Sequence, residues 1–463
     1  NVFFHHPTDG SAFSLKDFIT VDRTLSNVND DDYRERVYRY FYLLYTSEFV
    51  DNSSPFNYIK GPSGWGLLGG INMSGGAVED FAGYAVAINN LGNRVALSIP
   101  YFDGVYTTNV GLVRVYELNE NNIWQQLGGD NMRGIDLSGY TVPGIKLGGV
   151  EMKEELGNET SIPDIGSQNI SFNSTGDRIA IGSPFFDGNS KQGRVQIYKL
   201  NNSNWEIMSI SGGGEGPSDY SDELFGYSVS LNGIGNILVI GAPGNNKIYI
   251  YECIGDIWVK QKEEVNSSLG INFGWSTAIN FTGDIVAVGS PEYNSDSGMV
   301  QIYKFNSVAS SLTLYESISG DNPGDKLGYS IDLNASGNRI IVGIPNYNVS
   351  GIQNTGLVRV YGFEFDEFCV QLGNDNMYLG ENDNAGWSVS INNIGDRIVF
   401  GSYSDTAFTE KTVAKIYEYN NSEWVQVNNN ITASGNYRSG IPVSINDAGN
   451  IIITGEYMNG INK

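Results

Sequence analysis

Histidine, the residue used most often for acid–base catalysis, occurs in this chain only as His5 and His6. Both precede the repeated part of the sequence, so neither a Ser-His-Asp or Cys-His arrangement nor a histidine metal cluster is expected there. A His-His pair could bind a metal, but a mobile terminus is the simpler interpretation. The sequence therefore predicts no metal site, no cofactor and no imidazole catalysis.

Carboxylates are the other candidates for chemistry, because a glycosidase needs only two acidic side chains several ångströms apart. Acidic residues are abundant, with 52 Asp and Glu against 27 Lys and Arg. The sequence lacks the Ser-x-Asp-x-Gly-x-x-Trp box of sialidases, and no glycine-rich phosphate loop leads from a strand into a helix. A non-enzymatic protein is therefore the leading interpretation, and a carbohydrate-active enzyme is an alternative.

The net charge of −25 opposes binding to nucleic acid phosphates or to anionic lipid, because Coulomb repulsion acts against both. No apolar run approaches the length of a transmembrane helix, so membrane insertion is not expected. The two cysteines, Cys253 and Cys369, lie in strand-like runs and are interpreted as small buried hydrophobes. They form no disulfide framework, so they leave the redox compartment open.

The elements that must position any site come from an internal repeat. The phrase FGYSVSLNGIGNILVIGAP at 225–243 is echoed by GWSVSINNIGDRIVFGS at 386–402. Both contain the motif Asn-x-x-Gly-Asn/Asp. Seven copies have their glycine at Gly92, Gly176, Gly235, Gly283, Gly337, Gly395 and Gly449. A period of about 50 residues is typical of a propeller blade.

Each copy has the pattern of short strands joined by turns. In one copy the alternating segment YSIDLN leads into a turn, where Asn334 is expected to cap the backbone and Gly337 to be left-handed. The apolar run RIIVGIP at 339–345 then fits a buried strand. A third strand and a fourth follow, and in several copies the fourth carries a tryptophan such as Trp124. The recurring Trp and Tyr residues are interpreted as packing between blades.

The sequence therefore predicts an all-β fold, a seven-bladed β-propeller with four-stranded blades over 53–463. The seventh copy, IPVSINDAGNIIITGEY from Ile441, stops after two strands. Residues 56–76 repeat the pattern of a third and a fourth strand. We expect these N-terminal strands to complete the last blade and to leave no open sheet edge.

The order FG at 225–226 and GAP at 241–243 resembles the FG-GAP repeat of integrin-type β-propellers. The segments 356–377 and 385–402 look similar to the FG-GAP-like repeats of marine microbial and viral surface proteins. The resemblance covers about 56–463 and implies an extracellular or virion-surface scaffold used for adhesion. FG-GAP repeats often hold calcium in a longer, Asp-rich turn. Here each turn offers at most one carboxylate, so no calcium is expected within a turn.

Two groups of residues are candidate binding sites. Four loops carry an aromatic residue two positions after a proline, at Phe102, Phe186, Tyr293 and Tyr347. These rings either stack on a sugar, with neighbouring polar groups binding its hydroxyls, or fold back onto their own blades. The long interval between Gly92 and Gly176 adds an acidic insertion, which either binds a cation or a basic partner or is a solvated loop. Its acids include Glu151, Glu154, Glu155 and Glu159.

Residues 1–52 lack the repeat and are predicted to form an N-terminal arm. Helical spacing of apolar residues predicts one helix over about 31–49. The residues with this spacing are Tyr33, Val37, Phe41 and Leu44. The helix either packs across the propeller or docks into a partner chain, in which case other structural proteins are partners.

These features favour a non-enzymatic structural or adhesion protein with an extracellular or virion-surface location. The arm would anchor a virus or phage component, and the propeller would serve as a scaffold or bind a glycan or protein receptor. A cellular extracellular adhesin or appendage subunit and a carbohydrate-active enzyme are the alternatives. Binding to nucleic acid is not expected.

Overall fold

The computed structural model describes most of the repeated region. The described residues are 3–5, 12–14, 82–100, 102, 111–129, 169–184, 193–210, 224–265, 272–363, 369–375, 377–404, 412–427, 431–432, 439–440 and 442–455. The chain divides into two compact units, Asn1–Tyr58 and Ile59–Lys463. Within the described residues, no helix has the length and the apolar composition needed to cross a membrane.

The described part of the first unit is a β-hairpin, in which β1 (Phe3–His5) pairs antiparallel with β2 (Ala12–Ser14). The expected helical arm is corrected accordingly, because the described residues of the arm are strands. Tyr and Phe form strands as readily as helices, so aromatic spacing did not by itself specify a helix. The segment predicted to be helical, about 31–49, lies outside the described residues.

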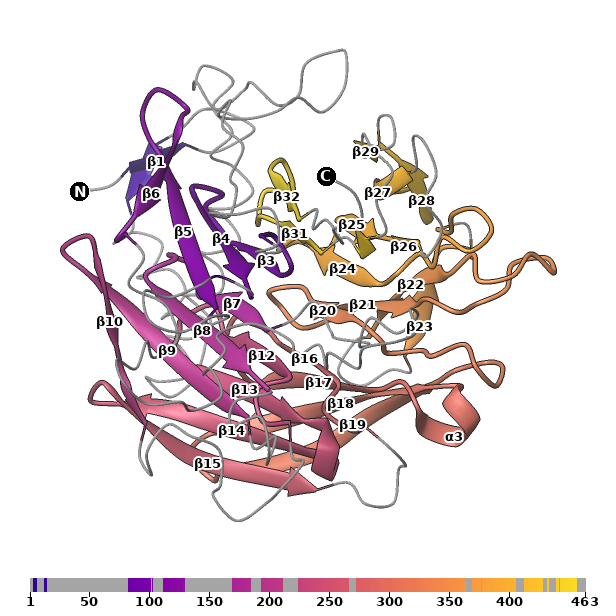
Figure 1. Cartoon of the computed structure of the whole chain (residues 1–463), viewed down its shortest axis with the longest axis horizontal. Helices are drawn as coiled ribbons and strands as arrows, with labels where there is room; N and C mark the ends of the chain where they lie inside the picture. The colour runs from indigo at the N-terminus through magenta and orange to yellow at the C-terminus, as the bar shows by residue number, and fades with distance from the viewer. Residues whose placement is uncertain are drawn as a thin grey trace. The chain divides into compact units, whose positions relative to one another are not determined.

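The described residues of the second unit form six blades, each with four antiparallel strands in chain order (Figure 1). The first blade has β3 (Val86–Ile88), β4 (Arg94–Ile99), β5 (Leu112–Leu118) and β6 (Trp124–Leu127). The second has β7 (Ile170–Phe172), β8 (Arg178–Ser183), β9 (Arg194–Asn201) and β10 (Asn204–Ile207). The third has β12 (Ser228–Leu231), β13 (Ile237–Ala242), β14 (Lys247–Ile254) and β15 (Ile257–Val265).

The other three blades repeat this order. The fourth has β16 (Ser276–Ile279), β17 (Ile285–Ser290), β18 (Met299–Asn306) and β19 (Ser311–Ser319). The fifth has β20 (Ile331–Leu333), β21 (Arg339–Ile344), β22 (Leu357–Gly362) and β23 (Val370–Leu372). The sixth has β24 (Ser388–Ile391), β25 (Arg397–Gly401), β27 (Thr412–Asn420) and β28 (Glu423–Gln426).

A few shorter elements complete the described part of this unit. β11 (Ser209–Ile210) pairs in parallel with the outer strand β15, and β29 (Ile431–Thr432) pairs with β27. β26 (Tyr403–Ser404) pairs with β30 (Ser439–Gly440). The short helices η1 (Pro243–Asn245) and α3 (Tyr293–Asp296) lie between the second and third strands of their blades.

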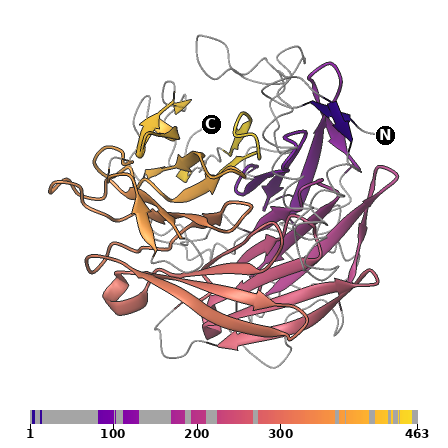
Figure 2. The ribbon, with the colours of Figure 1, turned by 180° about the vertical axis from the view of Figure 1, so that it is seen from behind.

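The prediction of seven four-stranded blades was wrong, because the structure has six. After the sixth blade, β31 (Val443–Ile445) and β32 (Ile452–Thr454) form a sheet of two strands. Their hairpin, yellow in Figures 1 and 2, lies between β24 and β3 and contacts both. Within its described residues, the seventh copy of the repeat supplies these two strands and no others. Residues 56–76, which were expected to add two more, lie outside the described residues.

The hydrophobic core lies between neighbouring blades. One cluster joins Val195 of the second blade to Leu238 of the third, and another joins Val300 of the fourth to Val342 of the fifth. The second strands are buried from their second residue onward, and β13 and β17 along their whole length, because both of their faces meet a neighbouring sheet. Trp424 also packs between blades and donates its indole N–H to the Leu372 carbonyl of the preceding blade at 3.0 Å.

The repeated asparagine folds the turn between the first and second strands. Asn232 is fully buried, and its Oδ1 accepts hydrogen bonds from the backbone N–H groups of Gly235, Asn236 and Ile237 at 2.8–3.1 Å. In the same way, Asn334 Oδ1 accepts from Arg339 N–H at 2.9 Å, and Gly337 has a φ of 70°. The predicted cap and left-handed glycine are therefore confirmed.

Pairs of glycines bring adjacent blades into backbone contact. A Cβ on Gly289 at the end of the fourth blade's second strand would collide with the carbonyl oxygen of Gly328 in the fifth blade. Gly241 and Gly343 stand in the same relation to Gly274 and Gly386. The glycine in each of these three second strands is therefore required by the close approach of the next blade.

Candidate functional site

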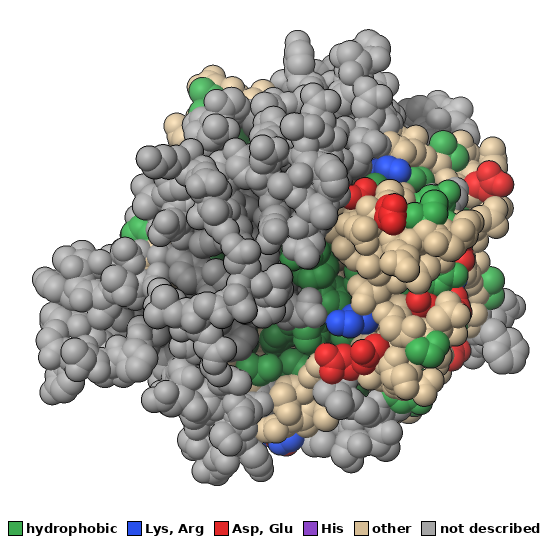
Figure 3. Space-filling view, turned by 45° about the vertical axis from the view of Figure 1, so that its right-hand side comes forward, with side chains coloured by type: hydrophobic (Ala, Val, Ile, Leu, Met, Phe, Trp, Pro, Cys, Tyr) green, Lys and Arg blue, Asp and Glu red, His purple; other side chains and the backbone are tan. Residues whose placement is uncertain are grey.

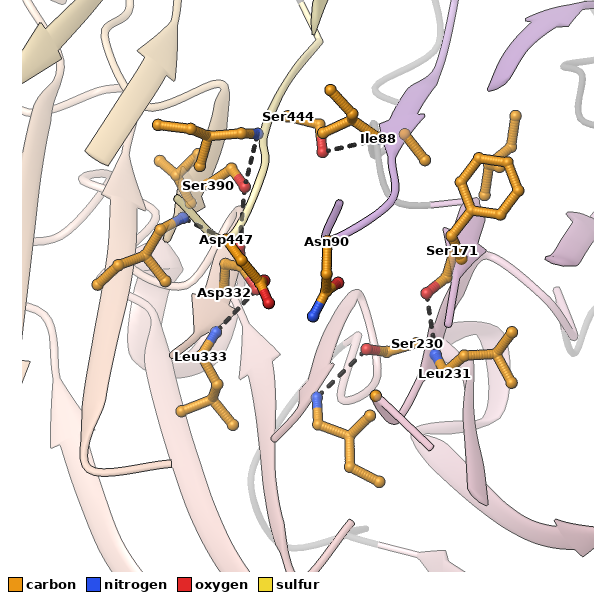
Figure 4. A pocket seen from close by; sticks show the side chains of 18 of the residues that line it. Ile88, Asn90, Ser171, Ser230, Leu231, Asp332, Leu333, Ser390, Ser444 and Asp447 are labelled. Carbon is orange, nitrogen blue, oxygen red and sulfur yellow. Dashed lines mark hydrogen bonds between the residues drawn. The ribbon is translucent and has the colours of Figure 1, made fainter. Parts of the chain in front are cut away.

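The inner strands surround a central cavity of about 190 Å³ (Figure 4). Six of them are the first strands of the blades, and the seventh is β31. The middle positions of the seven inner strands are Ala87, Ser171, Ser230, Ala278, Asp332, Ser390 and Ser444. The residues on both sides of each middle position are apolar except for Thr277, and Val229 and Leu231, for example, are buried in a cluster between blades. The middle residue of each strand is therefore the one that differs in chemistry along the cavity wall.

Serine at the middle position hydrogen-bonds the next inner strand around the ring. Leu231 N–H donates to Ser171 Oγ at 2.9 Å, and Ile279 N–H donates to Ser230 Oγ at 3.2 Å. An innermost strand has no further strand to pair with, so these hydroxyls satisfy backbone donors at its edge. The same bond links Ile445 N–H to Ser390 Oγ at 3.4 Å and Ile88 N–H to Ser444 Oγ at 3.3 Å.

Asp332 takes the place of the serine in the fifth blade. Its Oδ2 accepts from Ile391 N–H and from Ser390 O–H, both at 3.0 Å, and its Oδ1 accepts from Leu333 N–H at 2.9 Å. No ion pair among the described residues includes it. Although the cavity leaves its side chain partly exposed, the position deep in the protein raises the pKa of Asp332 to about 6. The three hydrogen bonds oppose this rise.

The turns after the inner strands form one end of the cavity and are bonded to each other in sequence. Asn393 N–H donates to the Asp447 carbonyl at 3.4 Å, and Asp447 N–H donates to the Asn90 carbonyl at 3.2 Å. These three residues occupy the same position in adjacent turns and all line the cavity. The equivalent residues on the other side are Gly233, Phe281 and Ala335. Among the described lining residues, the turn end of the cavity is therefore polar on one side only.

The chemistry that this cavity can perform is narrow. Among its described lining residues, Asp332 and Asp447 are the only charged ones, and none is Lys, Arg, His or Cys. All three hydrogen bonds of Asp332 are to its own wall. The volume lies below the roughly 300–1,000 Å³ typical of small-molecule sites. Across the described residues, no three His, Cys, Asp or Glu side chains gather as a metal-binding group.

Two of the predicted loop aromatics, Phe102 and Tyr347, occupy equivalent places in the first and fifth blades. Phe102 and Tyr347 are partly buried against the core clusters of their blades, and an arginine from the third strand lies over each ring. The guanidinium of Arg114 is 5.8 Å from the Phe102 ring centre, and that of Arg359 is 5.4 Å from that of Tyr347. Tyr293 is partly exposed at the start of α3.

The loops that carry these rings are bonded to the connections between blades. Lys326 N–H donates to the Asp296 carbonyl at 2.8 Å, which ties the α3 loop to the connection into the fifth blade. Asn384 N–H donates to the Asn354 carbonyl at 2.9 Å, and Asn382 N–H donates to the Gln353 carbonyl at 3.1 Å. The loops of the fourth to sixth blades therefore form one connected layer, here called the loop layer (residues 293–298, 320–327, 345–356 and 377–386).

The remaining predicted site residues lie outside the described part of the chain. They are Phe186, the acids Glu151, Glu154, Glu155 and Glu159, and the arm residues Tyr33, Val37, Phe41 and Leu44. Sequence reasoning missed the cavity residues Asp332, Asn393 and Asp447. A comparison of the copies contained the signal, because Asp332 in YSIDLN stands where YSVSLN and WSVSIN have serine.

Comparison with known proteins identifies no family for this chain. No family model matches the chain, and no curated protein matches it. Among solved structures, the chain is similar to Kuenenia stuttgartiensis hydrazine synthase at 10% identity and a TM-score of 0.48. The match covers 84% of this chain and 98% of that chain. We base the propeller fold on the strand pairing itself and transfer no activity from this likeness.

Proposed function

We propose that this chain is a non-enzymatic structural or adhesion protein that displays its propeller on a virus particle or on a cell surface. In this proposal the loop layer is the binding face, and its ligand is a cell-surface glycan. The hydrogen bonds that join the loops of three adjacent blades are the observation that carries the proposal.

Loops that are ordered before binding lose little conformational entropy when a ligand arrives. In the loop layer the backbone of one loop bonds to the backbone of the next, so each loop holds its neighbour in place. Thr355 adds to this order, because its hydroxyl donates to the Tyr347 carbonyl at 3.0 Å. Such a surface is suited to recognition by shape and by fixed polar groups.

The exposed side chains of the loop layer have the chemistry of a glycan site. Asn348, Ser350 and Gln353 are exposed and offer amide and hydroxyl groups for sugar hydroxyls. Tyr378 is 37% exposed and Ile352 is 47% exposed, so both offer apolar surface for a sugar face. Tyr293 and Tyr347 lie in the same loops.

Two further observations support this function. The central cavity is small and Asp332 is bonded to its own wall, which favours a binding or structural role over glycoside hydrolysis. The close contact between Gly241 and Gly274 gives a physical reason for the FG and GAP glycines. It therefore supports the proposed relation to FG-GAP repeats. We propose that residues 1–52 bind the chain to other structural proteins.

The proposal is tested by screening the full chain on an array of cell-surface glycans, with an Ile352→Ser, Tyr378→Ala double variant. Both residues are exposed, so the variant should fold as the wild type does. Val308→Ser is the matched control, because Val308 is 98% exposed in the β18–β19 hairpin, outside the loop layer. We expect the double variant to lose at least ten-fold in affinity and the control to lose nothing.

Two results would count against this function. Equal binding by the wild type and the double variant would remove the loop layer as the site. Absence of binding to every glycan, with the folded wild type binding cell-surface protein instead, would replace the glycan by a protein receptor.

A further inference from the structure

Three of the turns between first and second strands contain Asn-x-Ser/Thr, the acceptor motif for N-linked glycosylation. Their sequences are NST at 173–175, NFT at 280–282 and NAS at 334–336. The motif normally indicates a surface loop of a secreted protein, because the attached glycan is bulky. Here the acceptor asparagines, called the turn sites (Asn173, Asn280 and Asn334), are only 2–3% exposed. The turn sites therefore lie inside the fold rather than on its surface.

The amide nitrogen that would carry the glycan packs against the next blade. A Cβ atom placed on Gly235 of the third blade would lie only 2.8 Å from Asn173 Nδ2 in the second blade. The same distance is 3.0–3.1 Å in two further pairs of turns, Gly337 with Asn280 and Gly395 with Asn334. A single carbon atom is thus already closer to the nitrogen than ordinary van der Waals contact. A sugar ring bonded to that nitrogen would have to displace the turn of the next blade.

The hydrogens of the same amide are used in the folded state. Asn173 Nδ2 donates to Thr175 Oγ1 at 3.0 Å and to Asp177 Oδ1 at 2.7 Å. The other two turn sites repeat this pattern with the side chains two and four residues later. Glycan transfer bonds Nδ2 to the anomeric carbon of the sugar, breaks the bond between that carbon and its lipid diphosphate carrier, and releases one amide proton. The modified amide keeps one hydrogen for two acceptors, so glycosylation would also weaken the turn.

The motif in these turns follows from local turn chemistry. Its third residue donates to the side chain two residues later, as Thr175 Oγ1 does to Asp177 Oδ1 at 2.6 Å. This hydroxyl is not needed for the turn itself, because Ile234 has the same position in the turn that Asn232 caps. The acceptor motif can therefore be removed without removing the capping asparagine.

Acceptor motifs also occur at exposed positions. Tan atoms, which belong to uncharged polar side chains and to the backbone, make up most of the described surface in Figure 3. The sequence Asn-Asn-Ser forms the tips of the hairpins β9–β10 and β27–β28. Its first residues, called the hairpin sites (Asn201 and Asn420), are exposed. A glycan on either would extend into solvent, so the hairpin sites are an internal control for the turn sites.

We propose that glycosylation of the turn sites and folding of the propeller exclude each other, and that this chain folds in a compartment without N-linked glycosylation, such as the cytoplasm. In the endoplasmic reticulum, N-linked glycans are transferred to a chain while it is still being synthesised. Each turn site is covered by a blade that is synthesised after it, so burial would come too late to protect it. A virus particle assembled in the cytoplasm and a surface protein of a cell without this modification both meet the condition.

The test is translation of the full chain, with an added signal peptide, in a cell-free system that contains endoplasmic reticulum microsomes. Mass spectrometry measures glycan occupancy at each asparagine in all chains, and again in the chains that survive limited proteolysis because they have folded. We expect occupancy of the turn sites to be at least ten-fold lower in the surviving chains. Occupancy of the hairpin sites should be the same in both. Asn169, a buried acceptor outside these turns that is 1% exposed, should follow the turn sites.

A matched pair of variants tests the cause. A triple variant, Thr175→Ala with Thr282→Ala and Ser336→Ala, removes the turn motifs and keeps their asparagines. Alanine already has this position in the seventh copy, as Ala448, so the turns should tolerate it. The control removes the two hairpin motifs by Ser203→Ala and Ser422→Ala. We expect the triple variant to give at least three-fold more surviving chains than the wild type, and the control to give no increase.

Three results would overturn the proposal. Equal occupancy of the turn sites in all chains and in surviving chains would show that glycosylated chains fold. A wild type that folds in the microsomes with its turn sites unmodified would show that this compartment is open to it. An equal gain from the hairpin control would assign the effect to the number of glycans and not to their place. The occupancy measurement needs only the wild type, so it decides the matter even if the triple variant does not fold. Glycan binding by the loop layer is measured separately, so failure here leaves the proposed function untouched.

Discussion

The replacement of Asp332 by serine gives a test of how the ring of inner strands is held together. Serine is the residue that four other inner strands have at this position: Ser171, Ser230, Ser390 and Ser444. In Asp332→Ser, the new hydroxyl can accept the Ile391 N–H, as Ser390 accepts that of Ile445. The variant therefore keeps the bond between the fifth and sixth blades while it removes the carboxyl group.

The expected size of the effect follows from the pKa of Asp332, which rises from 3.8 to about 6 on folding. The folded state therefore holds the carboxyl proton of Asp332 more tightly than the unfolded state does. This tighter binding stabilises the folded state in full below about pH 4. It is lost as the pH rises to about 6, and the loss is about 3 kcal/mol for a shift of roughly two units. Serine removes this loss, but Ser390 O–H and Leu333 N–H each lose an acceptor, at about 1 kcal/mol apiece.

We expect the free energy of unfolding of Asp332→Ser to be about 1 kcal/mol higher than that of the wild type at pH 7. Near pH 4 we expect it to be about 2 kcal/mol lower. Guanidinium denaturation followed by tryptophan fluorescence measures both, with EDTA present to exclude bound cations. Ser230→Ala is the control: it removes one such backbone bond without a titrating group, so its cost of about 1 kcal/mol should not depend on pH. A difference between Asp332→Ser and the wild type that stays constant from pH 4 to pH 7 would refute the reasoning.

Two substitutions test the contacts that repeat around the ring. Gly289→Ala should lower the free energy of unfolding by about 3 kcal/mol, because its Cβ meets the backbone of Gly328. Gly351→Ala, where φ is 83° but the space is open, should cost only about 1 kcal/mol in the same denaturation assay. Similar losses in the two variants would contradict the steric explanation. Asn232→Ala should cost about 3 kcal/mol, because three backbone N–H groups lose their acceptor. Asn306→Ala, which removes the acceptor of a single exposed N–H, should cost less than about 1 kcal/mol, and an equal cost would contradict this account.

The sequence predicted those features that depend on local chemistry. Asn334 and Gly337 specify their turn through bonds within a few residues, so the pattern could be interpreted without the fold. The number of blades could not be derived from such local bonds, because it depends on whether segments far away in the sequence pair with β32. Aromatic spacing in the arm was equally ambiguous, since strands and helices share these residues.

The cavity was missed for a related reason. Asp332, Asn393 and Asp447 come from three different copies of the repeat, and each is unremarkable within its own turn or strand. Only the ring brings them to one wall. Had the middle residues of the inner strands been compared across copies, Asp332 would have been noticed as the carboxylate among serines and alanines. Its three hydrogen bonds would still have required the structure.

The bonds between inner strands also bear on how the copies of the repeat can diverge. Ser171 and Ser230 each bind a backbone N–H of the next copy rather than one of its side chains. Every copy offers that N–H whatever its sequence, so a change at the middle position of one copy needs no matching change in its neighbour. A duplicated or exchanged copy would therefore fit beside any other at this contact. Asp332, which binds the same type of N–H as the serines do, shows that a copy can acquire new chemistry at the cavity while the ring stays bonded.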